Sequence, residues 1–287
     1  MKEINIFPFY NKAIKLPGIS VLDSKEISFK PMNDIDFMGI SALAYNEKKG
    51  LFALSDRGNL FTLSLQIEDK KIKELKLIQA QSLLSKKGKP FTRKKRDSEG
   101  MDLTKYGLVV SFEQIPKVSL FDFGARKIKN YEITESLKDA KNYRSKNKAL
   151  ESVVYHPEFG VITAPEAPLK HLNEGTHTLY SLDKRWRFKA SGKITALELL
   201  EDENILVLER EFSLIKGHHI VLKKVFIKGC DRQPCDSEIL ASLKSTQGWT
   251  LDNFEGLTHI KDNIYLMVSD DNGNFFQKCL IVLFEVL

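Results

Sequence analysis

Sets of short apolar runs recur along most of this 287-residue chain, and the recurrence limits the folds that it can adopt. The runs have the composition of β-strands, and turn-forming residues such as Asp56-Arg57-Gly58-Asn59 separate them. A repeat of roughly 40–60 residues with four strands is typical of a β-propeller blade. The sequence therefore predicts an all-β protein, a β-propeller with five blades, with six blades as the alternative. Small residues open the five sets at spacings of 61, 52, 44 and 60 residues: Gly39, Gly100, Ser152, Ala196 and Gly256.

The last set has one strand fewer than the others, and a β-like run at 19–29 is otherwise unassigned. Pairing the two would close the ring and remove open sheet edges. We therefore expect a single propeller domain over 1–287, in which segment 17–30 completes the last blade. The one helix that we expect is at 131–141, inserted between blades, where Thr134 or Ser136 could cap a short turn. The expected strands are 39–45, 50–55, 60–65, 74–79; 100–103, 107–112, 117–121, 128–133; 152–155, 160–164, 178–182, 186–190; 196–200, 204–208, 219–222, 224–228; 256–260, 263–269 and 280–286.

The cysteine content is low, but two of the three cysteines lie close together. Cys230 and Cys235 (CDRQPC) flank a turn-like segment, and either a disulfide or two free thiols fit this spacing. Four intervening residues do not match the usual zinc spacing, and no second cysteine pair is present. Cys279 lies in an apolar run and is expected in the core.

Acidic residues occur at two matching positions of the sets. Glu99, Glu151 and Glu255 each precede the small residue that opens a set, and an acid follows the second strand of every set. The first two strands of a blade are antiparallel, so the start of one and the end of the other lie at the same mouth of the central channel. We therefore expect the three Glu at that mouth, with a second group of acids just outside: Asp56, Glu113, Glu166, Glu209 and Asp270.

So many carboxylates at one mouth would repel each other unless positive charge lies between them. Ca²⁺ binds about six to eight oxygens and prefers carboxylates, so it fits better than zinc. The six histidines have no metal-ligand spacing, and we expect most of them at the surface. In the alternative interpretation, the acids bind backbone amides or arginines and only hold the blades together. The candidate Ca²⁺ ligands are Asp56, Glu99, Glu113, Glu151, Glu166, Glu209, Glu255 and Asp270.

Two basic loops, 86–96 and 138–148, precede Glu99 and Glu151 and should lie at the same mouth. Such runs are commonly plain solvated loops. Around an acidic centre, however, a cationic rim suits a metal-dependent site that acts on a small anionic ester. The expected catalytic residues are Glu99, Glu151, Glu255 and Arg57. The expected substrate-binding residues are Arg57, Arg210, Lys94, Lys95 and Arg96.

Several other functions are disfavoured. The chain has no G-x-S-x-G elbow, no phosphate-binding glycine loop and no dinucleotide fingerprint. Few aromatic residues alternate with the basic ones, so despite a net charge of +6 we expect no nucleic acid partner. We also expect no transmembrane segment and no signal peptide at the start as given. The location would be periplasmic or secreted if a leader has been removed, and cytoplasmic if the chain is complete.

Motifs spread along the chain resemble the bacterial family described as "esterase-like activity of phytase" (phytase-like). They are GISALAY at 39–45, LSDRG at 54–58, DSEG at 97–100, NFEGL at 253–257 and VSDDN at 268–272. The resemblance implies a propeller-like fold, an exported bacterial protein and hydrolysis of esters or phosphoesters. Its matched positions are Asp56, Arg57, Glu99, Glu255, Asp270 and Asp271.

Two sets depart from the family's Glu-Gly form. Ser152 follows Glu151, and Thr195-Ala196 lacks the Glu, so a fully symmetric metal ring is not expected. Two hypotheses follow. The first is a Ca²⁺-dependent hydrolase of phosphate esters or related anionic esters, and the second is a non-enzymatic propeller that binds a ligand or a protein partner. In either case we expect a monomer.

Overall fold

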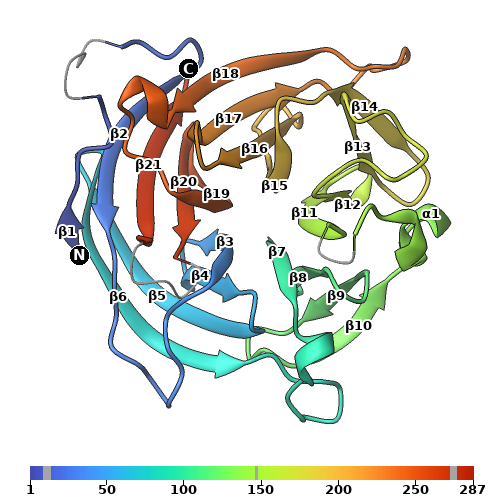
Figure 1. Ribbon diagram of the computed structural model, residues 1–287. Coiled ribbons are helices and arrows are strands. Elements are labelled where there is room, and N and C mark those ends of the chain that lie inside the picture. Colours follow the sequence, from blue (N-terminus) through green and yellow to red (C-terminus); the bar gives the residue numbers. More distant parts are fainter. Residues whose placement is uncertain (9–13, 146–147, 272–276) are drawn as a thin grey trace.

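In the computed structural model, residues 1–8, 14–145, 148–271 and 277–287 are described. Five antiparallel sheets form a ring, with one innermost strand of each sheet next to the central axis (Figure 1). The prediction of a five-bladed β-propeller is therefore confirmed, and the six-bladed alternative is wrong.

Four blades contain four strands each, ordered along the chain from the axis outwards. Blade 1 has β3 (Ile40–Asn46), β4 (Gly50–Ser55), β5 (Asn59–Glu68) and β6 (Lys71–Ser82). Blade 2 has β7 (Ser98–Thr104), β8 (Gly107–Phe112), β9 (Lys117–Phe121) and β10 (Lys127–Tyr131). Blade 3 has β11 (Leu150–His156), β12 (Gly160–Pro165), β13 (Thr176–Tyr180) and β14 (Arg185–Lys189). Blade 4 has β15 (Lys193–Leu199), β16 (Ile205–Ser213), β17 (Gly217–Val225) and β18 (Ser237–Lys244).

The fifth blade joins the two ends of the chain. Its strand β2 pairs with β21 in antiparallel register, from Ile19 opposite Val286 to Glu26 opposite Leu280. The predicted closure of the ring by an N-terminal strand is thus confirmed. A two-residue strand, β1, adds to the outer edge of the same sheet. From the axis outwards, the blade has β19 (Asn253–Lys261), β20 (Ile264–Asp270), β21 (Leu280–Val286), β2 (Ile19–Glu26) and β1 (Lys2–Glu3).

Blade 4 differs from the prediction in its outer half. The two strands predicted at 219–222 and 224–228 overlap the single strand β17, so a separate fourth strand there is wrong. Lys223 and Lys224 interrupt the apolar run, but no turn residue divides the segment, and β17 continues through both lysines. The true fourth strand, β18, comes after a loop that contains Cys230 and Cys235.

In the described residues, helical structure is limited to single turns. The helix predicted at 131–141 is too long, because Tyr131 belongs to β10 and the α-helix spans only Glu135–Lys138. Thr134 occupies the N-cap position, but its side chain makes no capping hydrogen bond. None of the helices in the described ranges has the length and hydropathy needed to span a membrane. The helical segments are η1 (Arg93–Lys95), α1 (Glu135–Lys138), η2 (Ala140–Asn142) and η3 (Ser245–Gln247).

The core consists of five apolar clusters, one between each pair of neighbouring blades. Both faces of the inner strands are covered, which explains why these strands read as nearly continuous apolar runs rather than strict alternation. Cys279 is 6% exposed within the cluster between blades 5 and 1, which confirms its predicted place in the core.

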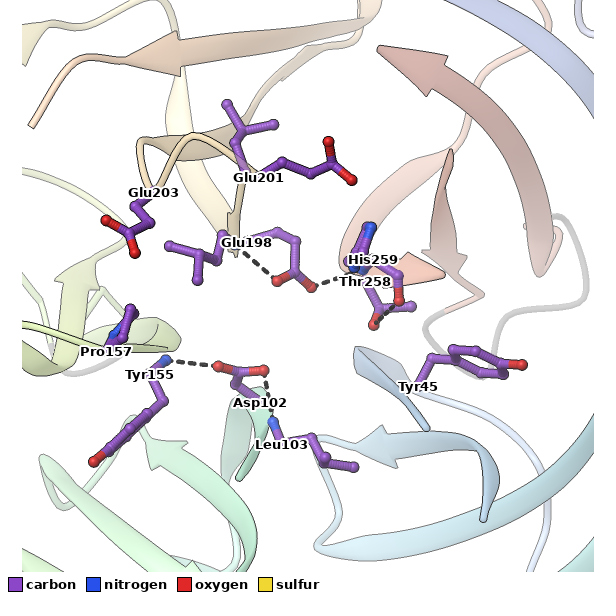
Figure 2. Close-up of a pocket in the computed structure, with 12 residues that line it drawn as sticks. Tyr45, Asp102, Leu103, Tyr155, Pro157, Glu198, Glu201, Glu203, Thr258 and His259 are labelled. Carbon is purple, nitrogen blue, oxygen red and sulfur yellow. Dashed lines mark hydrogen bonds between the residues drawn. The ribbon is translucent and has the colours of Figure 1, made fainter. Parts of the chain in front are cut away.

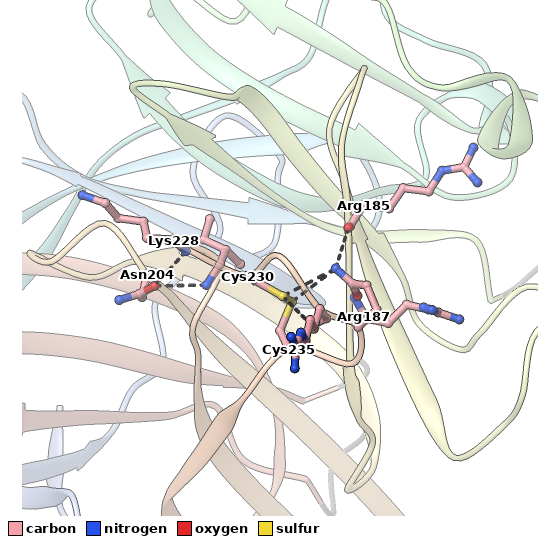
Figure 3. The surroundings of a disulfide bond; sticks show 9 residues. Arg185, Arg187, Asn204, Lys228, Cys230 and Cys235 are labelled. Atoms are coloured by element: carbon pink, nitrogen blue, oxygen red, sulfur yellow. Dashed lines mark hydrogen bonds between the residues drawn. A yellow bond between two sulfur atoms is a disulfide. The ribbon is translucent and has the colours of Figure 1, made fainter.

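Cys230 and Cys235 form a disulfide in the loop between β17 and β18 (Figure 3). The loop lies against β14, the outermost strand of blade 3. The Arg187 amide donates to Gln233 Oε1 (2.6 Å), and the Cys235 amide donates to the Arg187 carbonyl (2.6 Å). The disulfide loop therefore satisfies part of an edge strand that would otherwise present open backbone groups.

Candidate functional site

A β-bulge occurs near the start of the innermost strand in all five blades. The pairing register shifts between Leu150 and Ser152, for example, and Glu151 has no partner in the ladder. Bulges re-aim side chains, and this one does so at the same place in every blade. The bulged positions carry Ser41, Glu99, Glu151, Thr195 and Glu255.

At two of the five positions the side chain joins neighbouring blades. Ser41 Oγ donates to the Ser98 carbonyl (2.8 Å), and Thr195 Oγ1 donates to the Phe254 carbonyl (3.1 Å). A carboxylate can donate in this way only when it is protonated. An ionised Glu at this position therefore cannot take the role that the hydroxyl residues have.

The three Glu meet at one mouth, as predicted. Burial first, and then the neighbouring carboxylates of Glu151 and Glu255, raise the pKa of Glu99 well above its ordinary value. Burial likewise raises the pKa of Glu255 to about 8, although the Arg210 guanidinium opposes the shift. Arg210 Nη2 lies 3.3 Å from Glu255 Oε1, and both side chains are largely covered, at 16% and 14% exposed. The mouth therefore holds more negative charge than its own residues neutralise.

Asp97 belongs to this cluster, although the sequence analysis did not select it. Asp97, Glu99 and Glu113 each offer a carboxylate oxygen, and the three oxygens lie within 4.8 Å of one another. Burial, and then the charge of Asp97, raise the pKa of Glu113 to about 8. The signal that could have identified Asp97 is its place two residues before Glu99. Asn253, at the same place before Glu255, donates from Nδ2 to Glu255 Oε1 (2.6 Å).

The second strands end at the same mouth, as predicted. The amides of Asp56, Glu113 and Glu166 donate to the carbonyls of Gly39, Asp97 and Ala149, at 2.9, 3.0 and 2.9 Å. Each of these carbonyls lies just before the innermost strand of the same blade. Asp270, 4% exposed, lies opposite Asn253 in the ladder.

Glu209 and Glu166 differ from the other acids because lysines pair with them. Glu209 is fully buried, and Lys223 Nζ lies 2.6 Å from its Oε2. Lys193 Nζ lies 2.9 Å from Glu166 Oε1. Glu209 is thus already neutralised inside the blade, and it is the weakest of the predicted cation ligands.

The cationic residues predicted to bind substrate, apart from Arg210, lie at the rim. Arg57 is 45% exposed, lies 3.9 Å from Asp56, and donates to Met38 Sδ (2.9 Å). Lys94, Lys95 and Arg96 lie in and next to η1, in the connection from β6 to β7. Part of the second predicted basic loop, at 146–147, lies outside the described residues.

The donor set fits a hard divalent cation. Asp56 Oδ1 and Glu166 Oε2 are buried and accept no hydrogen bond from the described part of the chain. Oxygens of this kind at a crowded carboxylate site are the ligands that Ca²⁺ prefers. A cation bound to Asp97, Glu99 and Glu113 would also offset the repulsion that raises the pKa of these groups.

The histidines are less exposed than predicted. His171 is exposed, but His156 and His177 are 0% and 2% exposed, so the expectation of mostly surface histidines is wrong. Each of the two buried histidines has a backbone partner that compensates for burial. The Glu203 carbonyl lies 3.0 Å from His156 Nε2, and the Gly192 carbonyl lies 2.6 Å from His177 Nε2.

The opposite mouth holds a separate cavity of about 450 Å³ (Figure 2). Asp102 accepts from the amides of Leu103 and Tyr155 (both 2.6 Å), and Glu198 accepts from the amides of Leu199 and His259 (2.8 and 2.9 Å). Each carboxylate thereby joins its own blade to the next one. Between the two mouths the axis is nearly filled, with a free volume of about 10 Å³ next to small residues such as Gly100 and Ser152. The central channel is therefore closed in the middle, and it opens into two separate mouths, one at each end of the axis.

Glu198 is expected to make stability fall as the pH rises. Burial, and then the charge of Asp102, raise its pKa from 4.5 to about 8. The folded state binds more protons than the unfolded state in this window, so the contribution is fully present below pH 4.5 and is lost through about pH 8. Thermal unfolding between those values should show a smaller decline for Glu198→Gln than for wild type. Glu201→Gln, in the same cavity, should keep the wild-type slope, and an unchanged slope in Glu198→Gln would contradict the assignment.

Comparisons with known proteins place these features in context. The model of a family described as phytase-like, esterase-like activity of phytase, matches residues 35–273. No curated protein matches the sequence. Similar solved structures include a glutaminyl cyclase from Myxococcus xanthus (TM-score 0.48, 9% identity, 95% of this chain and 99% of that chain).

Two further structures have comparable similarity. They are a putative gluconolactonase (TM-score 0.45, 10% identity, 92% of each chain) and a PQQ-bound aldose sugar dehydrogenase from Streptomyces coelicolor (TM-score 0.45, 10% identity, 96% of this chain and 100% of that chain). Similarities at this level do not indicate a shared activity.

Proposed function

Because the chain belongs to the phytase-like family, described as esterase-like activity of phytase, we propose that it hydrolyses phosphate esters or related anionic esters with the help of Ca²⁺. The observation that carries the proposal is the convergence of Glu99, Glu151 and Glu255 beside Arg210 at one mouth. A carboxylate cluster next to an arginine provides both a cation site and a binding site for an anionic ester.

Each group has a proposed role. Asp97, Glu99 and Glu113 hold the cation, because their oxygens lie within 4.8 Å of one another. When bound, the cation supplies charge neutralisation and lowers the pKa of a water molecule. Arg210, fixed by Glu255, attracts the substrate anion, and Arg57 adds positive charge at the rim.

The remaining two carboxylates act on the water and on the leaving group. Glu151, whose pKa burial raises well above its ordinary value, orients the attacking water, and this water releases its proton to solvent as the new bond from oxygen to phosphorus forms. The bond from phosphorus to the ester oxygen breaks, and Glu255 gives a proton to the leaving oxygen. A pKa of about 8 suits Glu255 to donate near neutral pH, because it is largely protonated there.

The test is hydrolysis of β-glycerophosphate and phenyl acetate, whose basic leaving oxygens need a proton, with calcium and with a chelator. We expect turnover that requires calcium and that falls at least about 100-fold in Glu255→Gln, since an amide cannot supply the proton. Glu132→Gln, on a side chain that is 70% exposed, is the matched control and should keep full turnover. Absence of turnover with either ester, or full turnover in Glu255→Gln, would contradict the proposal.

The alternative is a propeller that binds a ligand or partner at this mouth without catalysis. The observation that favours it is the hydroxyl pair, Ser41 and Thr195, which joins neighbouring blades from the same bulge position. On this alternative, calcium would bind and stabilise the protein, but neither ester would be hydrolysed.

The Cys230–Cys235 disulfide supports a proposed periplasmic or extracellular location, because disulfides form mainly in oxidising compartments.

A further inference from the structure

One hairpin extends farther than its counterparts on the face that carries the acidic mouth. Strand β16 continues to Ser213, four residues beyond Glu209, whereas β4, β8 and β12 each end just before the corresponding acid. The extension is paired with β17, from Glu211 opposite His219 to Ser213 opposite Gly217. We call residues 210–219 the arm.

The tip of the arm is apolar and exposed. Leu214 and Ile215 are 95% and 92% exposed, the highest values among the large hydrophobic residues of the described ranges, and Phe212 is 58% exposed. The arm is nevertheless well held. The Lys216 amide donates to Ser213 Oγ (2.9 Å), and the His218 amide donates to Ser245 Oγ (3.2 Å). A fixed turn that exposes two aliphatic side chains to water indicates a binding surface.

A cationic hollow adjoins the arm. It has a volume of about 750 Å³, and it is lined by Lys216, Lys244 and Lys193, the last of which also pairs with Glu166 (2.9 Å). Glu211 is the one acid among its lining residues in the described part of the chain. Positive charge therefore lies directly beside the apolar tip.

We propose that the arm docks the propeller onto a lipid bilayer that contains anionic phospholipids. Leu214 and Ile215 enter the boundary between head groups and acyl chains, and the lysine-lined hollow receives head-group phosphates. The combination of an apolar tip and adjacent lysines matches the two parts of a phospholipid, and lysines near a negatively charged membrane surface add to the attraction. This inference does not depend on the proposed hydrolase activity.

The experiment is cosedimentation of the full chain with phosphatidylcholine vesicles, with and without about one third phosphatidylglycerol. Wild type should bind the anionic vesicles, and binding should weaken in high salt. Leu214→Ser with Ile215→Ser should lower the partition coefficient at least about tenfold, since both side chains leave water on docking. Both positions are exposed, so the variant should fold. Lys216→Glu with Lys244→Glu should abolish the preference for anionic vesicles.

Ile78→Ser with Ile239→Ser is the matched control, because these residues are 57% and 46% exposed on the outer strands β6 and β18. This control should bind like wild type. The proposal is wrong if wild type sediments with neither vesicle or if the arm variant binds as wild type does. It is also wrong if wild type instead self-associates and the arm variant does not, since the tip would then be an interface between two copies.

Discussion

Replacing Glu99 with Gln should stabilise the cation-free protein and remove its response to calcium. Near neutral pH, the ionised form of Glu99 is disfavoured by burial and by the charges of Glu151 and Glu255. The neutral amide avoids this repulsion, so the free energy of unfolding without cations should rise by about 1 kcal/mol, after allowance for screening by solvent. In wild type, calcium at about 100 times its Kd should add about 2.7 kcal/mol, and this gain should be lost in the variant.

Thermal and urea unfolding at about pH 7.5, with calcium and with a chelator, measure both effects. Glu135→Gln is the matched control, on a side chain that is 87% exposed, and it should respond to calcium like wild type. If Glu99→Gln unfolds the protein, then Glu99 holds the blades together. If the variant keeps the full calcium response, then Glu99 does not bind the cation. Hydrolysis of the ester substrates should fall together with the calcium response. Such a gain in stability with a loss of activity is expected, because active sites often keep charge that costs stability.

Replacing Lys223 with Met should destabilise the protein by about 3–5 kcal/mol, because Glu209 then remains as a buried charge without its lysine partner. Lys223 Nζ lies 2.6 Å from Glu209 Oε2 and also donates to the Lys189 carbonyl (2.6 Å) and to Ser191 Oγ (2.9 Å). These bonds link blades 3 and 4 near the acidic mouth. The urea midpoint of unfolding at constant m-value measures the loss.

A second variant separates the charge from the packing. Lys223→Met with Glu209→Gln should recover a large part of the stability, because the amide can still accept from the Ser191 amide, which lies 2.9 Å from Glu209 Oε1. Lys224→Met is the matched control, since its partner Asp202 is 46% exposed and surface pairs contribute about 1 kcal/mol or less. An equal loss in the single and double variants would show that packing, not charge, is responsible.

The recurrence of strand-like runs determined the fold class and favoured five blades over six. The spacing of Gly39, Gly100, Ser152, Ala196 and Gly256 indicated five sets, the missing strand of the last set indicated closure by the run at 19–29, and the structure decided the count. Local patterns were less informative in blade 4, where Lys223-Lys224 interrupt the apolar run without ending β17, and β18 follows only after the disulfide loop.

The location of the site was also predictable from sequence. The start of one strand and the end of its antiparallel neighbour must lie at the same edge, whatever the details of packing. The sequence thus brought Glu99, Glu151 and Glu255 to one mouth together with the acids that follow the second strands.

Only the tertiary structure decided what each acid does there. Glu209 is bound by Lys223, a diagonal neighbour on β17 two residues from its ladder partner Val221, whereas Asp97 joins Glu99 and Glu113 in one cluster. Strand periodicity specifies the face and the end of a strand, but the bulge that aims a side chain and the charge that meets it come from neighbouring strands and blades. For this reason the sequence determined where the carboxylates gather, and the packing of the five blades determined which of them are free to bind a cation.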